Sequence, residues 1–181
     1  MPQQPLPLID SARIEFGFTR TVCACADCVR NCQHLPGYLI PADLVRIQQH
    51  LAPDSDLLLW TRESLLASPG AVVAQQGRAI RIPTLVPAQR PGGGCLFLTA
   101  EQRCRIHPVA PFGCAFFDVH QAAEEADRRS IRGLQAVLQA WQRCDLYAQV
   151  WVALHEAGIV APAPEVARRR LRQACGENKS P

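Results

Sequence analysis

Cysteine is concentrated in two short segments of this chain, and this concentration constrains its folding more than any other feature. Seven of the nine cysteines lie in these segments. The first segment contains Cys23, Cys25, Cys28 and Cys32, and the second contains Cys95, Cys104 and Cys114. Core packing alone does not gather so many thiols, whereas thiolate is a strong ligand for zinc and for iron–sulfur clusters. The pattern therefore predicts metal binding through both segments.

The length and composition indicate one soluble domain. A chain of 181 residues suits a single domain and is large enough to bury its own core. The cysteines are therefore not needed as cross-links that stabilise a very small fold. We expect an extended N-terminal arm over 1–12, a cysteine-cluster domain over 13–160, and a short C-terminal helix and tail over 161–181. The net charge of +3 does not indicate a nucleic-acid surface. No run approaches the roughly 18 apolar residues of a membrane span, so neither nucleic acid nor a membrane is an expected partner.

The N-terminus lacks the basic region and apolar stretch of a secretory signal. This predicts a cytoplasmic protein, and in a reducing compartment many cysteines indicate metal or redox chemistry rather than disulfides. The odd number of cysteines also argues against complete disulfide pairing. Disulfides are the alternative if the chain is exported.

The spacing of apolar residues predicts a mainly helical α+β fold with a small β-hairpin. Helices are expected over 42–51, 56–67 and 124–157, and strands over 71–75 and 78–85. Gly133 favours a break in the last of these helices. We expect the core to form where the 134–154 helix packs on the 42–67 helices, with the cysteine segments tethered by metal.

One more cysteine extends the predicted ligand set. Cys25, Cys28 and Cys32 are three and four residues apart, so a helical turn would place them on one side. Cys144, on the predicted long helix, would be an eighth thiol and would complete two four-thiolate sites. An equally good interpretation of Cys144 and Cys175 is that they are buried in the core and act as small hydrophobic residues.

Histidine and aspartate side chains could complete a site. The candidates are His34, His107 and His120, with Asp27 and Asp118. Imidazole suits zinc and iron, but a lone histidine more often faces solvent or forms an ordinary hydrogen bond, and this is the favoured role for all three. Among them, His107 is the first candidate for a ligand. The aspartates would be oxygen ligands, partners that orient a ligand, or solvated turn residues.

The second segment resembles a known cysteine-rich family. Cys95 is followed by Phe97 and Leu98, and the later cysteines lie in the series Arg103–Cys104–Arg–Ile–His107 and Pro111–Phe–Gly–Cys114–Ala–Phe–Phe117. This series is similar to that of the YkgJ-type cysteine-cluster family, which is described as zinc- or iron-chelating, and the resemblance covers about residues 16–120. It implies that the cysteines chelate metal. Val29 stands where the family has an adjacent cysteine, and Ala110 stands where it has arginine.

Three functions are compatible with these features. The favoured one is a metal-binding protein that holds an iron–sulfur cluster, iron or zinc, in metal handling or electron transfer, with a protein partner not yet known. Relatives of the resembled family are linked to lysine methylation of flagellin, which implies an iron–sulfur-dependent modifying enzyme as an alternative. A zinc-stabilised interaction module is the third. No catalytic motif is present. The predicted ligands are Cys23, Cys25, Cys28, Cys32, Cys95, Cys104, Cys114 and Cys144, and we expect the two segments to share metal.

Overall fold

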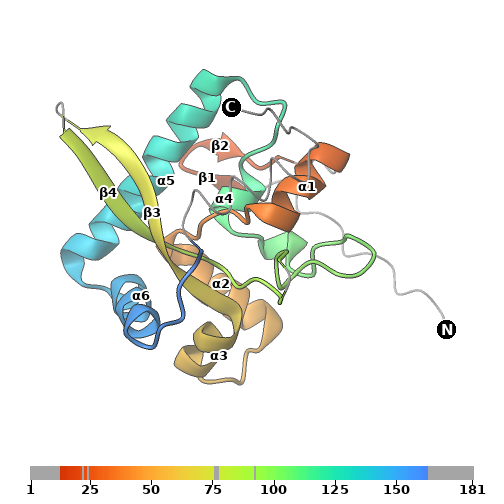
Figure 1. Ribbon diagram of the computed structural model, residues 1–181. Coiled ribbons are helices and arrows are strands. Elements are labelled where there is room, and N and C mark those ends of the chain that lie inside the picture. The colour runs from red at the N-terminus through yellow and green to blue at the C-terminus, as the bar shows by residue number, and fades with distance from the viewer. Residues whose placement is uncertain (1–12, 22, 24, 76–77, 92, 163–181) are drawn as a thin grey trace, which may run out of the picture.

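The computed structural model describes residues 13–162 except 22, 24, 76–77 and 92, and these residues form a mainly helical α+β domain (Figure 1). The elements in chain order are β1 (Ile14–Glu15), β2 (Phe18–Thr19), α1 (Ala26–His34), α2 (Pro41–Leu51), α3 (Leu57–Ser64), β3 (Leu65–Gln75), β4 (Arg78–Pro87), the short 3-10 helix η1 (His107–Val109), α4 (Phe112–Ala115), α5 (Ala123–Arg143) and α6 (Leu146–Glu156). The strands form two separate antiparallel pairs, β1–β2 and β3–β4. The expected fold class is confirmed. The predicted arm over 1–12, the C-terminal helix and Cys175 lie outside the described residues.

The β3–β4 hairpin is longer than the sequence pattern predicts. The predicted strands over 71–75 and 78–85 are its outer part, and β3 begins at Leu65, directly after α3 ends at Ser64. The predicted helix over 56–67 is therefore too long at its C-terminal end. Leu65 and Ala67 are buried and pair with residues of β4, so strand pairing overrides the local helical pattern.

The predicted helix over 124–157 is two helices, α5 and α6. The break lies at Cys144, whose φ of 50° is left-handed. Asp145 then caps α6 by accepting a backbone N–H of its first turn at 3.0 Å, a role that aspartate favours. The break predicted near Gly133 is wrong, because this glycine is buried inside α5. A Cβ there would lie 2.2 Å from the hydroxyl oxygen of Tyr38, so glycine allows α5 to approach.

The core lies between α2, α5, α6 and the hairpin. The expected packing of the 134–154 region on the 42–67 helices is present. Both α5 and α6 contact α2, and α6 also contacts α3. The hydroxyl of Tyr147 on α6 accepts the backbone N–H of Leu85 and donates to the carbonyl of Leu39, both at 2.8 Å. Every polar group of this buried contact is thereby paired. It ties α6 to β4 and to the segment that leads into α2.

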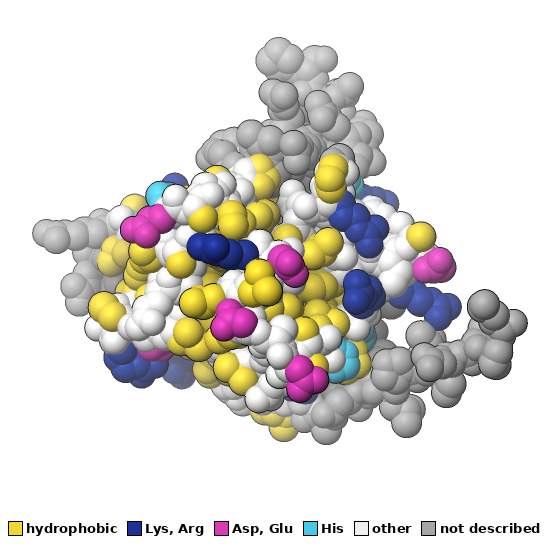
Figure 2. Space-filling model, turned by 90° about the horizontal axis from the view of Figure 1, so that it is seen from below, with side chains coloured by type: hydrophobic (Ala, Val, Ile, Leu, Met, Phe, Trp, Pro, Cys, Tyr) yellow, Lys and Arg dark blue, Asp and Glu magenta, His cyan; other side chains and the backbone are white. Residues whose placement is uncertain are grey.

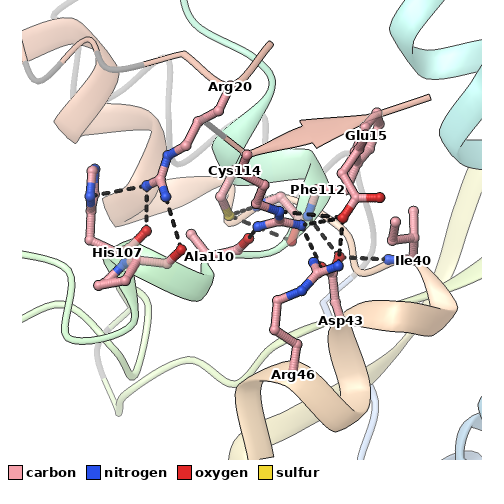
Figure 3. A network of polar contacts seen from close by, with 12 residues as sticks. Glu15, Arg20, Ile40, Asp43, Arg46, His107, Ala110, Phe112 and Cys114 are labelled. Carbon is pink, nitrogen blue, oxygen red and sulfur yellow. Dashed lines mark hydrogen bonds and ion pairs between the residues drawn. The ribbon is translucent and has the colours of Figure 1, made fainter. Parts of the chain in front are cut away.

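A buried carboxylate fixes the start of α2 to the start of α4 (Figure 3). Asp43 accepts the backbone N–H of Ile40 at 3.0 Å and that of Phe112 at 2.7 Å. It also contacts the guanidinium groups of Arg13 at 2.9 Å and Arg46 at 2.6 Å. These contacts offset part of the cost of burying the charge, although desolvation still raises the pKa of Asp43 above its ordinary value. They hold α4 in place, and α4 carries the last cysteine of the second segment.

Apolar surface is visible on the face that includes α3 and α6 (Figure 2). Leu58 and Leu59 on α3 are 52% and 56% exposed, and they line a groove with Val150, Ala153 and Leu154. Among the described helices, none combines the length and the apolar character needed to cross a bilayer.

Candidate metal centre

Three cysteines and one histidine come together at α1. One ligand atom from each of Cys23, Cys25, Cys28 and His120 lies within 4.8 Å of the other three. Three thiolates and one imidazole are an established tetrahedral ligand set for zinc, with bond lengths of about 2.0–2.3 Å. These four residues, the Cys3His centre below, therefore lie close enough to form a metal site.

Local structure positions the ligands of this centre. Cys25 is the N-cap residue of α1 and Cys28 lies in its first turn, so the two side chains are adjacent on one side of the helix. The unpaired N–H groups at this helix end favour negative charge on the sulfurs. His120 comes from the loop after α4, where its backbone N–H donates to Oδ1 of Asp118 at 2.8 Å. Asp118 therefore shapes the loop that presents the imidazole.

The electrostatics of the Cys3His centre favour one thiolate. Nε2 of His120 lies 3.3 Å from Sγ of Cys25. The backbone N–H of Cys28, followed by the imidazole, lowers the pKa of Cys25 to about 6. Desolvation and the neighbouring thiols raise the pKa of Cys28 to about 12. Contact with Cys25 raises the pKa of His120. A metal ion therefore meets the thiolate of Cys25 near neutral pH and has to displace the proton of Cys28.

The other four clustered cysteines surround a separate pocket. It is lined by Cys32, Cys95, Cys104 and Cys114, with walls from Pro36, Pro87, Leu98, Ile106 and Pro111. Isolated antiparallel bridges hold two of the loops, at Gln89–Cys95 and Leu98–Cys104. The remaining two cysteines come from the last part of α1 and from α4. In this four-thiol pocket the two cysteine segments of the sequence meet.

Burial keeps the thiols of this pocket protonated at neutral pH. Desolvation raises the pKa of Cys95 to about 11 and that of Cys104 to about 12. It also raises the pKa of Cys32 and of Cys114. Metal ligands must be deprotonated, so binding here would release protons to solvent.

Several predicted ligands lie outside these two groups. Cys144 is exposed at the C-terminal end of α5, and Figure 1 shows the α5–α6 junction far from α1. Nδ1 of His107 lies 3.0 Å from a guanidinium nitrogen of Arg20. Asp27 forms an ion pair with Arg30 at 3.0 Å, with both side chains more than a third exposed. Asp27 is therefore solvated, as expected, but it lies in the first turn of helix α1 and not in a loop turn.

The structure brings His120 to the thiols, although hydrogen bonding was the expected role of all three histidines and His107 was the first candidate for a ligand among them. His34 is the last residue of α1 and is not part of the Cys3His centre. No short spacing to a cysteine marks His120. The one local signal is Asp118 two residues earlier, since aspartate at this offset is typical of a turn that holds the following backbone N–H.

Comparison with known proteins gives no match: no family model matches the chain, and neither a curated protein nor a solved structure is similar to it.

Proposed function

We propose that this protein binds zinc or iron at the Cys3His centre and functions in metal handling. The observation that carries the proposal is the approach of three thiol sulfurs and one imidazole nitrogen to within 4.8 Å of one another. Thiolate and imidazole select zinc and iron over magnesium and calcium, which take oxygen ligands. The proposal agrees with what the resemblance to the YkgJ-type family implies.

The compactness of the centre favours a single ion. At a Zn–S distance of about 2.3 Å, tetrahedral geometry places neighbouring sulfurs roughly 3.8 Å apart. The observed limit of 4.8 Å is compatible with this separation after a small adjustment of side chains. An iron–sulfur cluster would place its ligands on different iron atoms, further from one another.

The position of the centre favours exchange of the ion over a purely structural role. His120 is exposed and the three cysteines are only half-buried. No residue of α1 is buried in the core. An ion held there is accessible to a chelating partner from the solvent side. We therefore favour a protein that takes up and passes on metal.

Anaerobic titration with Co²⁺ tests the proposal, because tetrahedral cobalt thiolates have visible ligand-field bands that aqueous cobalt lacks. His120→Ala and Cys25→Ser should each weaken binding at this centre by about 100-fold or more, since loss of a residue that only orients a metal ligand already costs about 10–100-fold. His50→Ala and Cys144→Ser are matched controls at exposed positions and should bind like the wild type. The proposal fails if the wild type shows no such bands, or if all four variants bind cobalt equally well.

Binding at the Cys3His centre should weaken in acid. The ion takes a neutral imidazole and thiolates, so protons compete with it. Contact with Cys25 raises the pKa of His120 above its ordinary value of 6.5, so the imidazole is increasingly protonated as the pH falls through that range. We expect the dissociation constant for Co²⁺ to increase about tenfold or more per pH unit below it. Titrations at a series of pH values check this, and a constant affinity from pH 8 to pH 5.5 would contradict it.

A further inference from the structure

We propose that the four-thiol pocket binds an iron–sulfur cluster, as a second centre distinct from the Cys3His centre. The proposal goes beyond the proposed function, which concerns a single ion at the surface. Three observations support it: four free thiols line one pocket, backbone N–H groups face the sulfurs, and the other walls of the pocket are apolar.

Four different helices and loops each contribute one cysteine to this pocket. Cys32 comes from α1, Cys95 and Cys104 from two bridged loops, and Cys114 from α4. In each of the six pairs of these residues, the sulfurs are close enough for a negative charge on one to raise the pKa of the other. All four are free thiols. If these four thiols lose their protons in this buried place, a cation is needed to compensate the negative charge.

The ligand set of this pocket suits an iron–sulfur cluster. It consists of four thiols without an imidazole. Four cysteine thiolates are the usual ligands of two-iron and four-iron clusters, which spread them over several iron atoms.

Backbone N–H groups face three of the four sulfurs. The N–H of Gly37 donates to Sγ of Cys114 at 3.1 Å. Cys95 and Cys104 each accept a hydrogen bond from the backbone N–H two residues further along the chain. Such donors disperse thiolate charge and tune the potential of iron–sulfur clusters. A cysteine that acts only as a small hydrophobic residue needs none of them.

The donor at Gly37 depends on the absence of a side chain. A Cβ at this position would lie 2.0 Å from the carbonyl carbon of Gly113. The two backbones can approach this closely only as glycines, and the approach places the N–H on the sulfur of Cys114. The close packing of these two glycines therefore serves the pocket directly.

The remaining surroundings suit a buried anionic cluster. The walls other than sulfur are proline, leucine and isoleucine, which limit access of water. The positive charge of Arg90 lowers the pKa of Cys95, and that of Arg20 lowers the pKa of Cys104. Both charges therefore favour the thiolate form. As each sulfur binds iron, its thiol proton leaves to solvent. The two arginines and the N–H donors then offset part of the negative charge that the four thiolates bring.

Anaerobic reconstitution of the full chain with ferric and ferrous iron and sulfide tests the proposal. We expect iron and acid-labile sulfide in about equal amounts, broad visible absorption, and a paramagnetic resonance signal after reduction with dithionite. Cys104→Ser and Cys32→Ser should each lose most of the sulfide and the signal. Cys32 is only partly buried where it packs against the core, and no residue of α1 is fully buried, so we expect this variant to fold even if Cys104→Ser folds poorly. Cys144→Ser is the exposed control and should keep both.

The outcomes separate this proposal from the proposed function. His120→Ala should keep the cluster while it loses cobalt binding at the Cys3His centre, and Cys32→Ser should do the reverse. A wild-type protein that takes up iron without labile sulfide would overturn the cluster, whatever the result at the Cys3His centre. So would labile sulfide that remains unchanged in Cys32→Ser.

Discussion

Loading the protein with metal is expected to raise its free energy of unfolding by about 4 kcal/mol when free metal exceeds the dissociation constant about 1,000-fold. Only the folded chain brings the ligands together, so the binding free energy becomes folding free energy. For a chain of this size, the gain corresponds to a rise of roughly 8–16 °C in the unfolding midpoint. Thermal unfolding under anaerobic conditions, with excess zinc or with a chelator, measures it.

The effect of metal should be concentrated in α1. This helix has nine residues, none of them buried, and an isolated helix of this length is marginal in water. Cys28 belongs to the Cys3His centre and Cys32 to the four-thiol pocket, so α1 contributes to both groups of ligands. Chelation should therefore remove hydrogen-exchange protection from 26–34 and leave α5, which packs in the core, protected.

Two results would contradict this account of α1. One is an unfolding midpoint that does not change between chelator and excess metal. The other is uniform exchange, in which α1 and α5 respond to chelation to the same extent. The double variant Cys28→Ser/Cys32→Ser is the matched reference, because it should unfold at one temperature whether or not metal is present.

Replacing Asp43 by alanine is expected to destabilise the domain by about 3–5 kcal/mol, because it removes one partner from a buried ionic network. The side chain of Asp43 is fully buried, and that of Arg13 is 9% exposed. The variant leaves Arg13 without its shortest ion pair and leaves the N–H groups of Ile40 and Phe112 without their acceptor. Chemical denaturation of the wild type and the variant at the same metal concentration measures the difference.

Two comparisons isolate the role of this carboxylate. Asp54→Ala removes an exposed carboxylate from the loop after α2 and should change stability by less than about 0.5 kcal/mol. Asp43→Asn keeps one oxygen acceptor but loses the charge that Arg13 and Arg46 contact, so an intermediate loss is expected. Equal stability of Asp43→Ala and Asp54→Ala would show that the network does not stabilise the fold.

Local patterns in the sequence predict a large part of this fold. The periodic apolar residues of α2 and the alternating strands of the hairpin are local signals, and both elements form. The start of β3 at Leu65 was not predictable, because it depends on pairing with a strand further along the chain. The break at Cys144 was likewise hidden, since its apolar spacing continues from α5 into α6.

The candidate site is predictable in its residues but not in its grouping. Clustering of cysteines identifies the seven thiols, because few other roles gather them. Helical spacing would place Cys25, Cys28 and Cys32 together, yet Cys32 lies one turn beyond Cys28 and lines the other pocket. The grouping depends on which loops fold back on α1. His120 contacts Cys25 although the two residues are 95 positions apart in the sequence. No local spacing encodes a contact of that range.

Elemental analysis of the protein purified without oxygen shows whether the Cys3His centre holds a metal ion. We expect zinc or iron bound in the wild type, and loss of the metal of this centre in the double variant Cys25→Ser/His120→Ala, with Cys144→Ser unchanged. Protein that is folded, has reduced thiols and contains neither metal, even after incubation with zinc and ferrous iron, would contradict it.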